Sequence, residues 1–549
     1  MSAPRDIPTA WTTGSTEVFK TGTWRAALPK HIHAPSPCHA ACPVNGDIAE
    51  WIGRAHARDF RGAWEVLTRH NPFPAVSGRV CHHPCEPACN RAGYDESLAI
   101  CRLERFVGDW ALAEGWTFPP VQTARPERIA VVGGGPSGLG AAFHLRRRGY
   151  AVTLFESRPE LGGLMRYGIP SYRLPRPVLD GEIARIVALG VEVRCGESMD
   201  STHDFERLRN GFDAVYLAIG ARCQKRLPRL DYARPWVMEG ADYLARANAG
   251  ESPALGRRLV VIGGGSAAID VARCARRAGH EVTIVALESR PQMPAQREEV
   301  WEALEEGVRL VDGAMLTRAV DHGRSGLALH CVRVHFEARA TRGQFTVTPV
   351  CGSEFALQAD AVVPAIGQDP DLAPLSALAA DGTLLAADER QATSVERVYA
   401  GGDVASMARF VTEAIGMGKR AAREIDRALR GGEPGAIGEE KVVGLSSINT
   451  FYYAPLGRAT ERRRSAAQRL ADNGEVQLGL NLEQALAEAQ RCFSCGTCIQ
   501  CDNCVQYCPD LAVKREGGGY VVLTDYCKGC GLCVKECPTG SMKMTEEKR

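Results

Sequence analysis

The chain has 549 residues, of which 24% are charged, and a formal net charge of +1. This length allows several domains, whereas the near-zero charge gives no strong field to attract nucleic acid or an anionic membrane surface. No run of about 18 apolar residues is present, so we expect no membrane-spanning helix. Residues Met1 to Lys30 lack the apolar core of a secretory signal, and the sequence therefore predicts a cytoplasmic location.

Residues 1–125 are predicted to form a helical domain that carries a metal or iron–sulfur site. Helical patterning is present over Asp47–Arg58 and Phe60–Arg69, and six cysteines lie between Cys38 and Cys101. Disulfide scaffolds occur mainly in small secreted domains. Clustered thiols in a large intracellular chain are better explained as ligands of a metal or an iron–sulfur cluster.

A repeated strand–glycine–helix unit forms the middle of the chain. Arg128–Val132 runs into the turn Gly133-Gly-Gly-Pro-Ser-Gly138, and Arg258–Ile262 runs into Gly263-Gly-Gly-Ser-Ala-Ala268. Such a turn lets the backbone reach a pyrophosphate, and the helix that follows points its N-terminus at the anion. Because the β-α-β unit occurs twice, we expect two dinucleotides, for which FAD and a nicotinamide cofactor are the usual pair.

An acidic residue follows each turn at or near the end of the next strand. Glu156 lies 18 residues past Gly138, where a carboxylate can hydrogen-bond a ribose hydroxyl. In the second unit, Glu288 would repel a 2′-phosphate and favours NADH, although Arg290 could meet a phosphate and NADPH stays open. The predicted cofactor-binding residues are Gly133, Gly135, Pro136, Ser137, Gly138 and Glu156 in the first unit, and Gly263, Gly265, Ser266, Ala267, Ala268, Glu288 and Arg290 in the second.

The last residues, 489–549, contain two identical four-cysteine runs, each followed by proline. The spacing C-x₂-C-x₂-C-x₃-C is that of bacterial two-cluster ferredoxins, in which the fourth cysteine of each run ligates the other cluster. Two complete runs argue against a zinc ribbon. We therefore expect one [4Fe–4S] cluster on Cys498, Cys501, Cys504 and Cys537, and another on Cys527, Cys530, Cys533 and Cys508. The sequence leaves the role of Cys492 and Cys495 open.

Further motifs are Gly162-Gly163, Val215–Gly220, Val363–Pro370 and Tyr399–Asp403. They resemble the flavoprotein disulfide-reductase fold and, more closely, the small-subunit flavoproteins of glutamate synthase and their relatives. The resemblance implies FAD at the first turn, with Gly162, Gly163, Gly402 and Asp403, and NAD(P)H at the second. A capped turn before a helix is the alternative role of Gly402 and Asp403. No Cys-x₄-Cys pair follows the first turn, so electrons must leave the flavin by a route other than a disulfide.

The N-terminal cysteines are similar to those of the helical iron–sulfur domain of the same family. The resemblance implies one cluster on Cys42, Cys81, Cys85 and Glu104. Relatives carry a Cys-x₂-Cys pair where this chain has Lys30 and His33, so a second cluster stays open. It could use Cys38, Cys89 and Cys101, with His33 or His31 as a further ligand; alternatively, only one cluster forms and Cys101 is a packing residue.

The sequence thus predicts a multidomain α/β chain. The predicted order is a helical Fe–S domain (1–125), a FAD-binding domain (126–235 and 358–430) interrupted by an NAD(P)H-binding domain (236–357), a linker (431–488) with a helix near Leu482–Arg491, and an α+β ferredoxin-like domain (489–549).

The expected function is electron transfer between NAD(H) or NADP(H), FAD and [4Fe–4S] clusters, with no catalytic side chain. We expect an NAD(P)-reactive subunit of a 2-oxoacid or aldehyde oxidoreductase, with iron–sulfur catalytic partner subunits or ferredoxin. The alternatives are a glutamate synthase small subunit and a stand-alone NAD(P)H:ferredoxin oxidoreductase.

Overall fold

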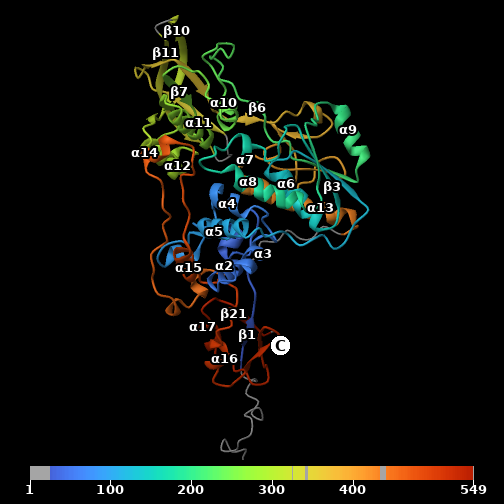
Figure 1. Ribbon diagram of the computed structural model, residues 1–549. Helices are drawn as coiled ribbons and strands as arrows, with labels where there is room; N and C mark the ends of the chain where they lie inside the picture. The colour runs from blue at the N-terminus through green and yellow to red at the C-terminus, as the bar shows by residue number, and fades with distance from the viewer. Residues whose placement is uncertain (1–24, 324–325, 340–343, 433–440, 548–549) are drawn as a thin grey trace, which may run out of the picture.

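The computed structural model describes residues 25–323, 326–339, 344–432 and 441–547. Most of residues 1–30, on which the prediction of a cytoplasmic location rests, therefore lies outside the described residues. Two α/β domains lie at one end of an elongated molecule, a helical domain lies in the middle, and a small cysteine-rich module lies at the other end (Figure 1). Among the helices in these ranges, none is long and apolar enough to cross a membrane.

The first α/β domain is built on a five-stranded parallel sheet in the order β18-β5-β2-β3-β4. Its strands are β2 (Arg128–Val132), β3 (Ala151–Glu156), β4 (Glu192–Cys195), β5 (Ala214–Leu217) and β18 (Val398–Ala400). Its helices are α6 (Pro136–Arg147), α7 (Leu164–Tyr167), α8 (Arg176–Val187), α9 (Thr202–Gly211) and α13 (Val411–Leu429), and a short pair, β16 (Ala380–Asp381) and β17 (Leu384–Leu385), completes it. Apart from the exposed first residues of β2 and β3, the central strands are buried, as expected for a parallel sheet that is covered on both faces.

The second α/β domain has a four-stranded parallel sheet in the order β14-β7-β8-β9 and an antiparallel sheet beside it. The parallel strands are β7 (Arg258–Ile262), β8 (Glu281–Val285), β9 (Arg309–Val311) and β14 (Ala361–Pro364); the antiparallel strands are β10 (Ala314–Asp321), β11 (Leu327–Ala338), β12 (Phe345–Pro349) and β13 (Phe355–Ala359); the helices are α10 (Gly240–Asn248), α11 (Ser266–Arg277) and α12 (Arg297–Glu305).

Two neighbouring connections join the two α/β domains. One contains β6 (Cys223–Gln224) and the other contains β15 (Gln368–Asp369), and these two short strands pair with each other. Because β14 pairs with β7, the second domain extends past residue 357, where the sequence placed its end. The short apolar sequence of β14 is compatible with either parallel sheet, so the sequence alone did not show that β14 belongs to the second domain.

The helical domain consists of α1 (Pro37–Ala41), α2 (Ile48–His56), α3 (Phe60–Leu67), α4 (Pro74–Val80), η3 (Asn90–Gly93) and α5 (Ile100–Ala113). The helices predicted over Asp47–Arg58 and Phe60–Arg69 correspond to α2 and α3. Helices α4 and α5 cross closely, because a Cβ on Gly78 or Gly108 would collide with the backbone of the facing helix.

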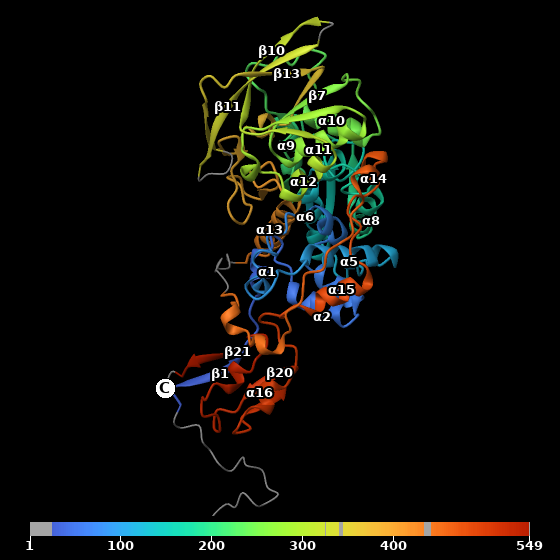
Figure 2. The same cartoon turned by 90° about the vertical axis from the view of Figure 1, so that its left-hand side faces the viewer.

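The first described residues belong to the C-terminal module and not to the helical domain, which corrects the predicted boundary. Strand β1 (Ala27–His31) pairs antiparallel with β21 (Met542–Glu546), so the two ends of the chain lie side by side (Figure 2). Without β1, the edge of β21 would leave backbone donors and acceptors unpaired. The module also contains α16 (Asn503–Gln506), β19 (Val513–Glu516), β20 (Gly519–Val522) and α17 (Leu532–Lys535).

The segment predicted as a linker packs against the other domains, and residues 441–488 are called the strap below. Residues 433–440 lie outside the described part. The strap contains η7 (Leu445–Ser447), η8 (Thr450–Tyr452), α14 (Ala466–Ala471) and most of α15 (Leu482–Gln490). Arg469, 2% exposed, forms an ion pair with Glu305 of α12 at 2.6 Å, and the Arg458 guanidinium donates to Ser97 Oγ in the helical domain at 2.9 Å.

Candidate functional site

The first glycine-rich turn joins β2 to α6. Gly133 has a φ of 109°, a left-handed value that favours glycine, and a Cβ there would collide with the carbonyl that follows β5. The Gly134 N–H donates to Glu156 Oε2 at 2.8 Å, so the predicted acid lies at the rim of the turn. A Cβ on Gly135 would have no neighbour closer than 3.9 Å, at Gly163. The backbone is therefore open to the approach of a pyrophosphate at the N-terminus of α6.

The other residues predicted for FAD gather at the same turn. The Gly162 N–H donates to a carbonyl of the turn at 2.8 Å. Gly402 has a φ of 76°, and a Cβ there would lie 3.0 Å from Ser137 Cβ at the start of α6. Burial raises the pKa of the adjacent Asp403, and the charge of Arg409 opposes this rise. The structure thus brings together the predicted set Gly133, Gly135, Pro136, Ser137, Gly138, Glu156, Gly162, Gly163, Gly402 and Asp403.

The second turn joins β7 to α11 in the same way. A Cβ on Gly264 would collide with the Glu288 carboxylate, so this acid takes the place that Glu156 has at the first turn. Burial raises the pKa of Glu288. Arg290 is exposed, and its guanidinium lies over the Trp301 ring, 5.7 Å from the centroid. The charged side chain in contact with the turn is therefore the acid. The other predicted residues form the turn and the start of α11: Gly263, Gly265, Ser266, Ala267 and Ala268.

Three cysteines and one acid of the helical domain form a buried group beside the first α/β domain. Cys42 and Cys81 are the C-caps of α1 and α4, and Cys85 follows in the next loop. Burial raises the pKa of Cys81 to about 12, with the charges of Glu104 and Cys42 adding to the rise. The Asn71 side chain donates to Glu104 Oε1 at 2.8 Å, and burial raises the pKa of Glu104 to about 8. The set implied by the resemblance, Cys42, Cys81, Cys85 and Glu104, is thus brought together.

This group faces the FAD-type site. Cys81 Sγ lies 3.3 Å from Thr412 Oγ1 in the first turn of α13. The ring of His82 stacks on that of Phe410, with centroids 3.8 Å apart. Because Phe410 and Thr412 follow the segment that contains Asp403, the cysteine group and the FAD-type turn contact the same short stretch of chain.

Among the ligands that the sequence left open for a second N-terminal cluster, Cys101 and the two histidines lie away from Cys38. Cys101 lies beside Cys81 and not with Cys38, and its thiol donates to the Gly78 carbonyl at 3.4 Å, because the close crossing of α4 and α5 directs it there. The histidines are also elsewhere: the His31 ring contacts Tyr520 in the C-terminal module, with centroids 5.5 Å apart, and His33 is exposed.

The C-terminal cysteines are grouped in the two sets that their spacing predicts. Cys498, Cys501, Cys504 and Cys537 line one cavity of about 280 Å³. Burial raises the pKa of Cys533 to about 12, and the charges of its set, Cys527, Cys508 and Cys530, add to the rise. Backbone N–H groups point at the sulfurs, as from Ala512 to Cys508 Sγ at 3.2 Å.

These thiols lie in two groups of four, which suits a pair of clusters. A zinc ion draws its sulfurs to about 2.3 Å from one point. Within the described residues, no three His, Cys, Asp or Glu side chains lie close enough together for that. The residues present therefore fit iron–sulfur clusters, whose irons separate the ligating sulfurs.

The sequence reasoning missed one pair of cysteines. Cys492 and Cys495, whose role it left open, lie on a cavity together with Cys38 and Cys89 of the helical domain. A signal for this pair was present in the sequence. The Cys-x₂-Cys pair that relatives carry near the N-terminus is absent there, and the chain has a Cys-x₂-Cys pair at residues 492–495 instead.

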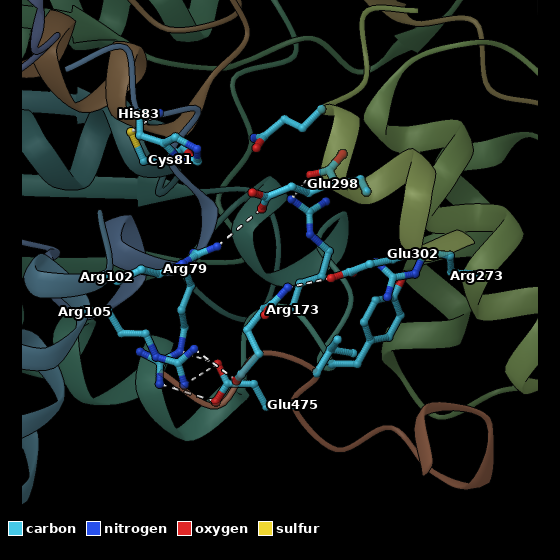
Figure 3. A pocket seen from close by; sticks show the side chains of 15 residues that line it. Arg79, Cys81, His83, Arg102, Arg105, Arg173, Arg273, Glu298, Glu302 and Glu475 are labelled. Carbon is cyan, nitrogen blue, oxygen red and sulfur yellow. Dashed lines mark hydrogen bonds and ion pairs between the residues drawn. The ribbon is translucent and has the colours of Figure 1, made fainter. Parts of the chain in front are cut away.

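A cavity of about 570 Å³ lies between the helical domain, both α/β domains and the strap (Figure 3). Ion pairs at or beside this cavity join the domains: Arg102 of α5 lies 3.4 Å from Glu298 of α12, and Arg173 lies 2.7 Å from Asp270 of α11. Cys81 also lines it. These contacts hold the second α/β domain against both the first and the helical domain.

Comparisons with known proteins agree with this architecture. The pyridine nucleotide-disulphide oxidoreductase family matches residues 127–418. A dihydropyrimidine dehydrogenase domain II family with a 4Fe-4S cluster matches residues 33–116, and a 4Fe-4S dicluster domain matches residues 497–542.

Three relatives cover most of the chain. The NADP(+)-dependent formate dehydrogenase subunit beta of Moorella thermoacetica is 35% identical over 507 residues, which are 86% of this chain and 72% of that protein. The NADPH-Fe(3+) oxidoreductase subunit beta of Geobacter sulfurreducens is 34% identical over 516 residues (85% and 77%), and the NAD-dependent dihydropyrimidine dehydrogenase subunit PreT of Escherichia coli is 32% identical over 400 residues (72% and 92%). The expected resemblance, fold class and cofactors are thereby confirmed. The chain belongs to the pyridine nucleotide-disulphide oxidoreductase family and is an electron-transfer oxidoreductase that uses FAD, NAD(P)(H) and [4Fe–4S] clusters.

Proposed function

We propose that this chain is the NADH-reactive subunit of a multisubunit oxidoreductase and exchanges electrons with an iron–sulfur partner. The observation that carries the proposal is the order of the sites along the molecule. The nucleotide turns lie at one end, the Cys81 group contacts the FAD domain at Thr412, and the ferredoxin-like module lies at the other end (Figure 1). This order suits a path from a nucleotide to an external redox centre.

The residues that would hold the cofactors follow from the groups described above. The first turn and Asp403 would hold FAD, and the second turn would hold the nicotinamide dinucleotide. The grouped thiols would be the cluster ligands as thiolates, which iron favours. The proposed ligand sets are Cys42, Cys81, Cys85 and Glu104 in the helical domain, Cys498, Cys501, Cys504 and Cys537 in the tail, and Cys527, Cys530, Cys533 and Cys508 beside them.

When bound, a flavin supplies the exchange between two-electron hydride chemistry and single-electron transfer. The protein then has to position the nucleotide, exclude water and keep the thiols buried. The Arg173–Asp270 and Arg102–Glu298 ion pairs fix the second domain against the first and the helical domain. No proton has to be moved by a side chain in the hydride step, so we assign no catalytic residue.

The partner is proposed to dock on the ferredoxin-like module. Large apolar side chains are exposed around its cysteine loops, among them Ile499 at 50%, Tyr507 at 51% and Leu511 at 59%. Exposed apolar side chains that gather in one region mark interaction surfaces. The relatives named as beta subunits belong to enzymes of different substrates, so the substrate site is proposed to lie on the partner. A 2-oxoacid or aldehyde substrate stays a prediction.

Anaerobic purification of the tagged full chain from its native host tests the proposal. We expect FAD, iron and acid-labile sulfide, NADH oxidation with a small quinone, and a stoichiometric partner that itself contains an iron–sulfur cluster. An Ile499→Asp, Leu511→Asp variant should lose the partner but keep NADH:quinone activity. A lone chain that reduces free ferredoxin at full rate would support the stand-alone reductase instead.

A further inference from the structure

Four cysteines from three distant segments meet where the helical domain adjoins the C-terminal module. Cys38 lies on α1, Cys89 precedes η3, and Cys492 and Cys495 follow α15. All four line one cavity of about 340 Å³, together with apolar side chains that include Ile52. Cys38 is 9% exposed and Cys495 is 8% exposed. The thiols thus share one cavity with a mainly apolar lining.

Hydrogen-bond donors are directed at these sulfurs. The Asn90 side-chain amide donates to Cys495 Sγ at 3.2 Å, and the Ser494 N–H donates to Cys492 Sγ at 3.4 Å. The Ser36 hydroxyl lies 3.1 Å from Cys38 Sγ. Such donors favour the thiolate form, and hydrogen bonds to sulfur are a usual feature of iron–sulfur sites.

The four thiols and their cavity suit a cluster better than a single metal ion. One zinc ion would gather the four sulfurs to about 2.3 Å from its centre, and no described group of His, Cys, Asp or Glu is that tight. The neighbouring cavity, which carries a ferredoxin spacing of cysteines, is of similar size, about 280 Å³. We propose that Cys38, Cys89, Cys492 and Cys495 bind an additional [4Fe–4S] cluster, which is completed only when the two ends of the chain come together.

A buried ion-pair network fixes the segment that carries Cys492 and Cys495 against the helical domain that carries Cys38 and Cys89. Arg491, directly before Cys492, lies 2.7 Å from Glu488 and 3.2 Å from Asp95, and its carbonyl accepts from the Arg91 guanidinium at 3.0 Å. Glu488 is almost completely buried, and its carboxylate also accepts from a backbone N–H of the helical domain. Charges removed from water in this way are costly unless they are paired, so the network specifies this one arrangement of the segments.

The site lies between the two other groups of thiols. Cys38 lies on α1 and Cys42 is the C-cap of the same helix, and four residues of helix span only about 6 Å. Cys85 and Cys89 are also only four residues apart, in one short loop. On the other side, the Tyr453 hydroxyl donates to the Phe493 carbonyl at 3.1 Å and to the Pro538 carbonyl at 3.2 Å. These carbonyls adjoin Cys492 and Cys537. If the proposed function is correct, this cluster therefore links the flavin-side cluster to the ferredoxin-like module.

The test uses the full chain, purified without oxygen, with each of the four cysteines changed to alanine in turn. The wild-type chain should contain about sixteen irons, as four [4Fe–4S] clusters require. Cys38→Ala, Cys89→Ala, Cys492→Ala and Cys495→Ala should each lose about four irons and the same EPR signal of the dithionite-reduced protein, and should keep FAD. Cys331→Ala, which removes a buried thiol of β11 far from this site in the second α/β domain, should lose none.

The combination of Cys38→Ala with Cys492→Ala decides whether the two ends share one site. The double variant should lose no more iron than either single variant. A loss of about eight irons, an unchanged count in the single variants, or one zinc atom per wild-type chain in place of the additional cluster would overturn the proposal. NADH:quinone activity is measured in parallel, because its absence from a wild-type chain with sixteen irons would refute the proposed function and leave this site intact.

Discussion

The two cysteine-rich ends of the chain build their sites in different ways. In the C-terminal module, eight cysteines fall within residues 498–537, and both sets close within that stretch. In the helical domain, the steps Cys38–Cys42 and Cys85–Cys89 are each divided between two groups, and Cys38 and Cys89 face a pair that lies about 400 residues away. A local motif thus fixes which thiols meet in the module, whereas tertiary packing fixes it in the helical domain. The sites of the C-terminal module should therefore tolerate separation from the rest of the chain better than the sites of the helical domain.

The largest expected effect comes from breaking the electron path at its two ends. Cys504→Ala in the module should lose about four irons and lower NADH-driven ferredoxin reduction by at least about 100-fold. NADH should still reduce the N-terminal clusters, since these lie on the flavin side of the break. Cys81→Ala should abolish ferredoxin reduction as well, but should leave the clusters of the C-terminal module oxidised by the EPR criterion. NADH:quinone activity should persist in both, and equal EPR spectra in the two variants would contradict the order of sites.

The next effect concerns the fourth ligand of the Cys81 group. Glu104 and Cys101 both lie near it, but Cys101 donates to the Gly78 carbonyl, whereas Glu104 faces Cys42 and Cys81. Glu104→Ala should therefore lose about four irons, and Cys101→Ala should lose none. Glu104→Cys should restore the iron content with a shifted reduction potential, because ligand type tunes the cluster. An intact iron count in Glu104→Ala would assign the fourth position to another group.

The contrast between the two ends also explains which features the sequence could predict. Both glycine turns, α2, α3 and the grouping of the eight C-terminal cysteines follow from patterns within a few tens of residues. The pairing of β1 with β21 does not, because a five-residue strand with a central proline shows no alternation. The sequence of the strap predicts a linker because ion pairs such as Arg469–Glu305, together with a few scattered apolar residues, show no apolar periodicity. The site at Cys492 was missed for the same reason: its two halves have no common pattern.

A smaller effect is expected at the second nucleotide turn. Glu288→Ala removes the carboxylate next to Gly264 and should raise the ratio of kcat/KM for NADPH over NADH about tenfold, which corresponds to about 1.4 kcal/mol. Glu281→Ala removes an exposed acid from the start of β8, the strand that precedes Glu288, and should leave the ratio of kcat/KM values unchanged. Steady-state rates with a quinone acceptor measure both variants. A wild-type enzyme that already prefers NADPH would refute this role of Glu288.

The smallest effect tests how firmly the helical domain is attached to the FAD domain. Glu182 of α8 is fully buried, and its carboxylate accepts from the Ala75 and Val76 N–H groups at the start of α4, both at 2.9 Å. Burial raises the pKa of Glu182 to about 8, although these two N–H groups oppose the rise. The unfolded chain therefore loses this proton first, so the stabilisation is present below the unfolded pKa and is lost as the pH rises toward 8.

This dependence should appear in the free energy of unfolding of the helical domain, followed by the fluorescence of its tryptophans in guanidinium. The wild type should lose up to about 1.4 kcal/mol per pH unit between pH 5 and pH 8 from this residue. Glu182→Gln cannot ionise, so it should lack this slope. At pH 5 the variant should be less stable by about 1 kcal/mol, because one backbone donor loses its acceptor, and the difference should shrink or reverse toward pH 8. Equal slopes in the two proteins would mean that Glu182 is ionised in the fold, and that its two N–H partners outweigh its burial.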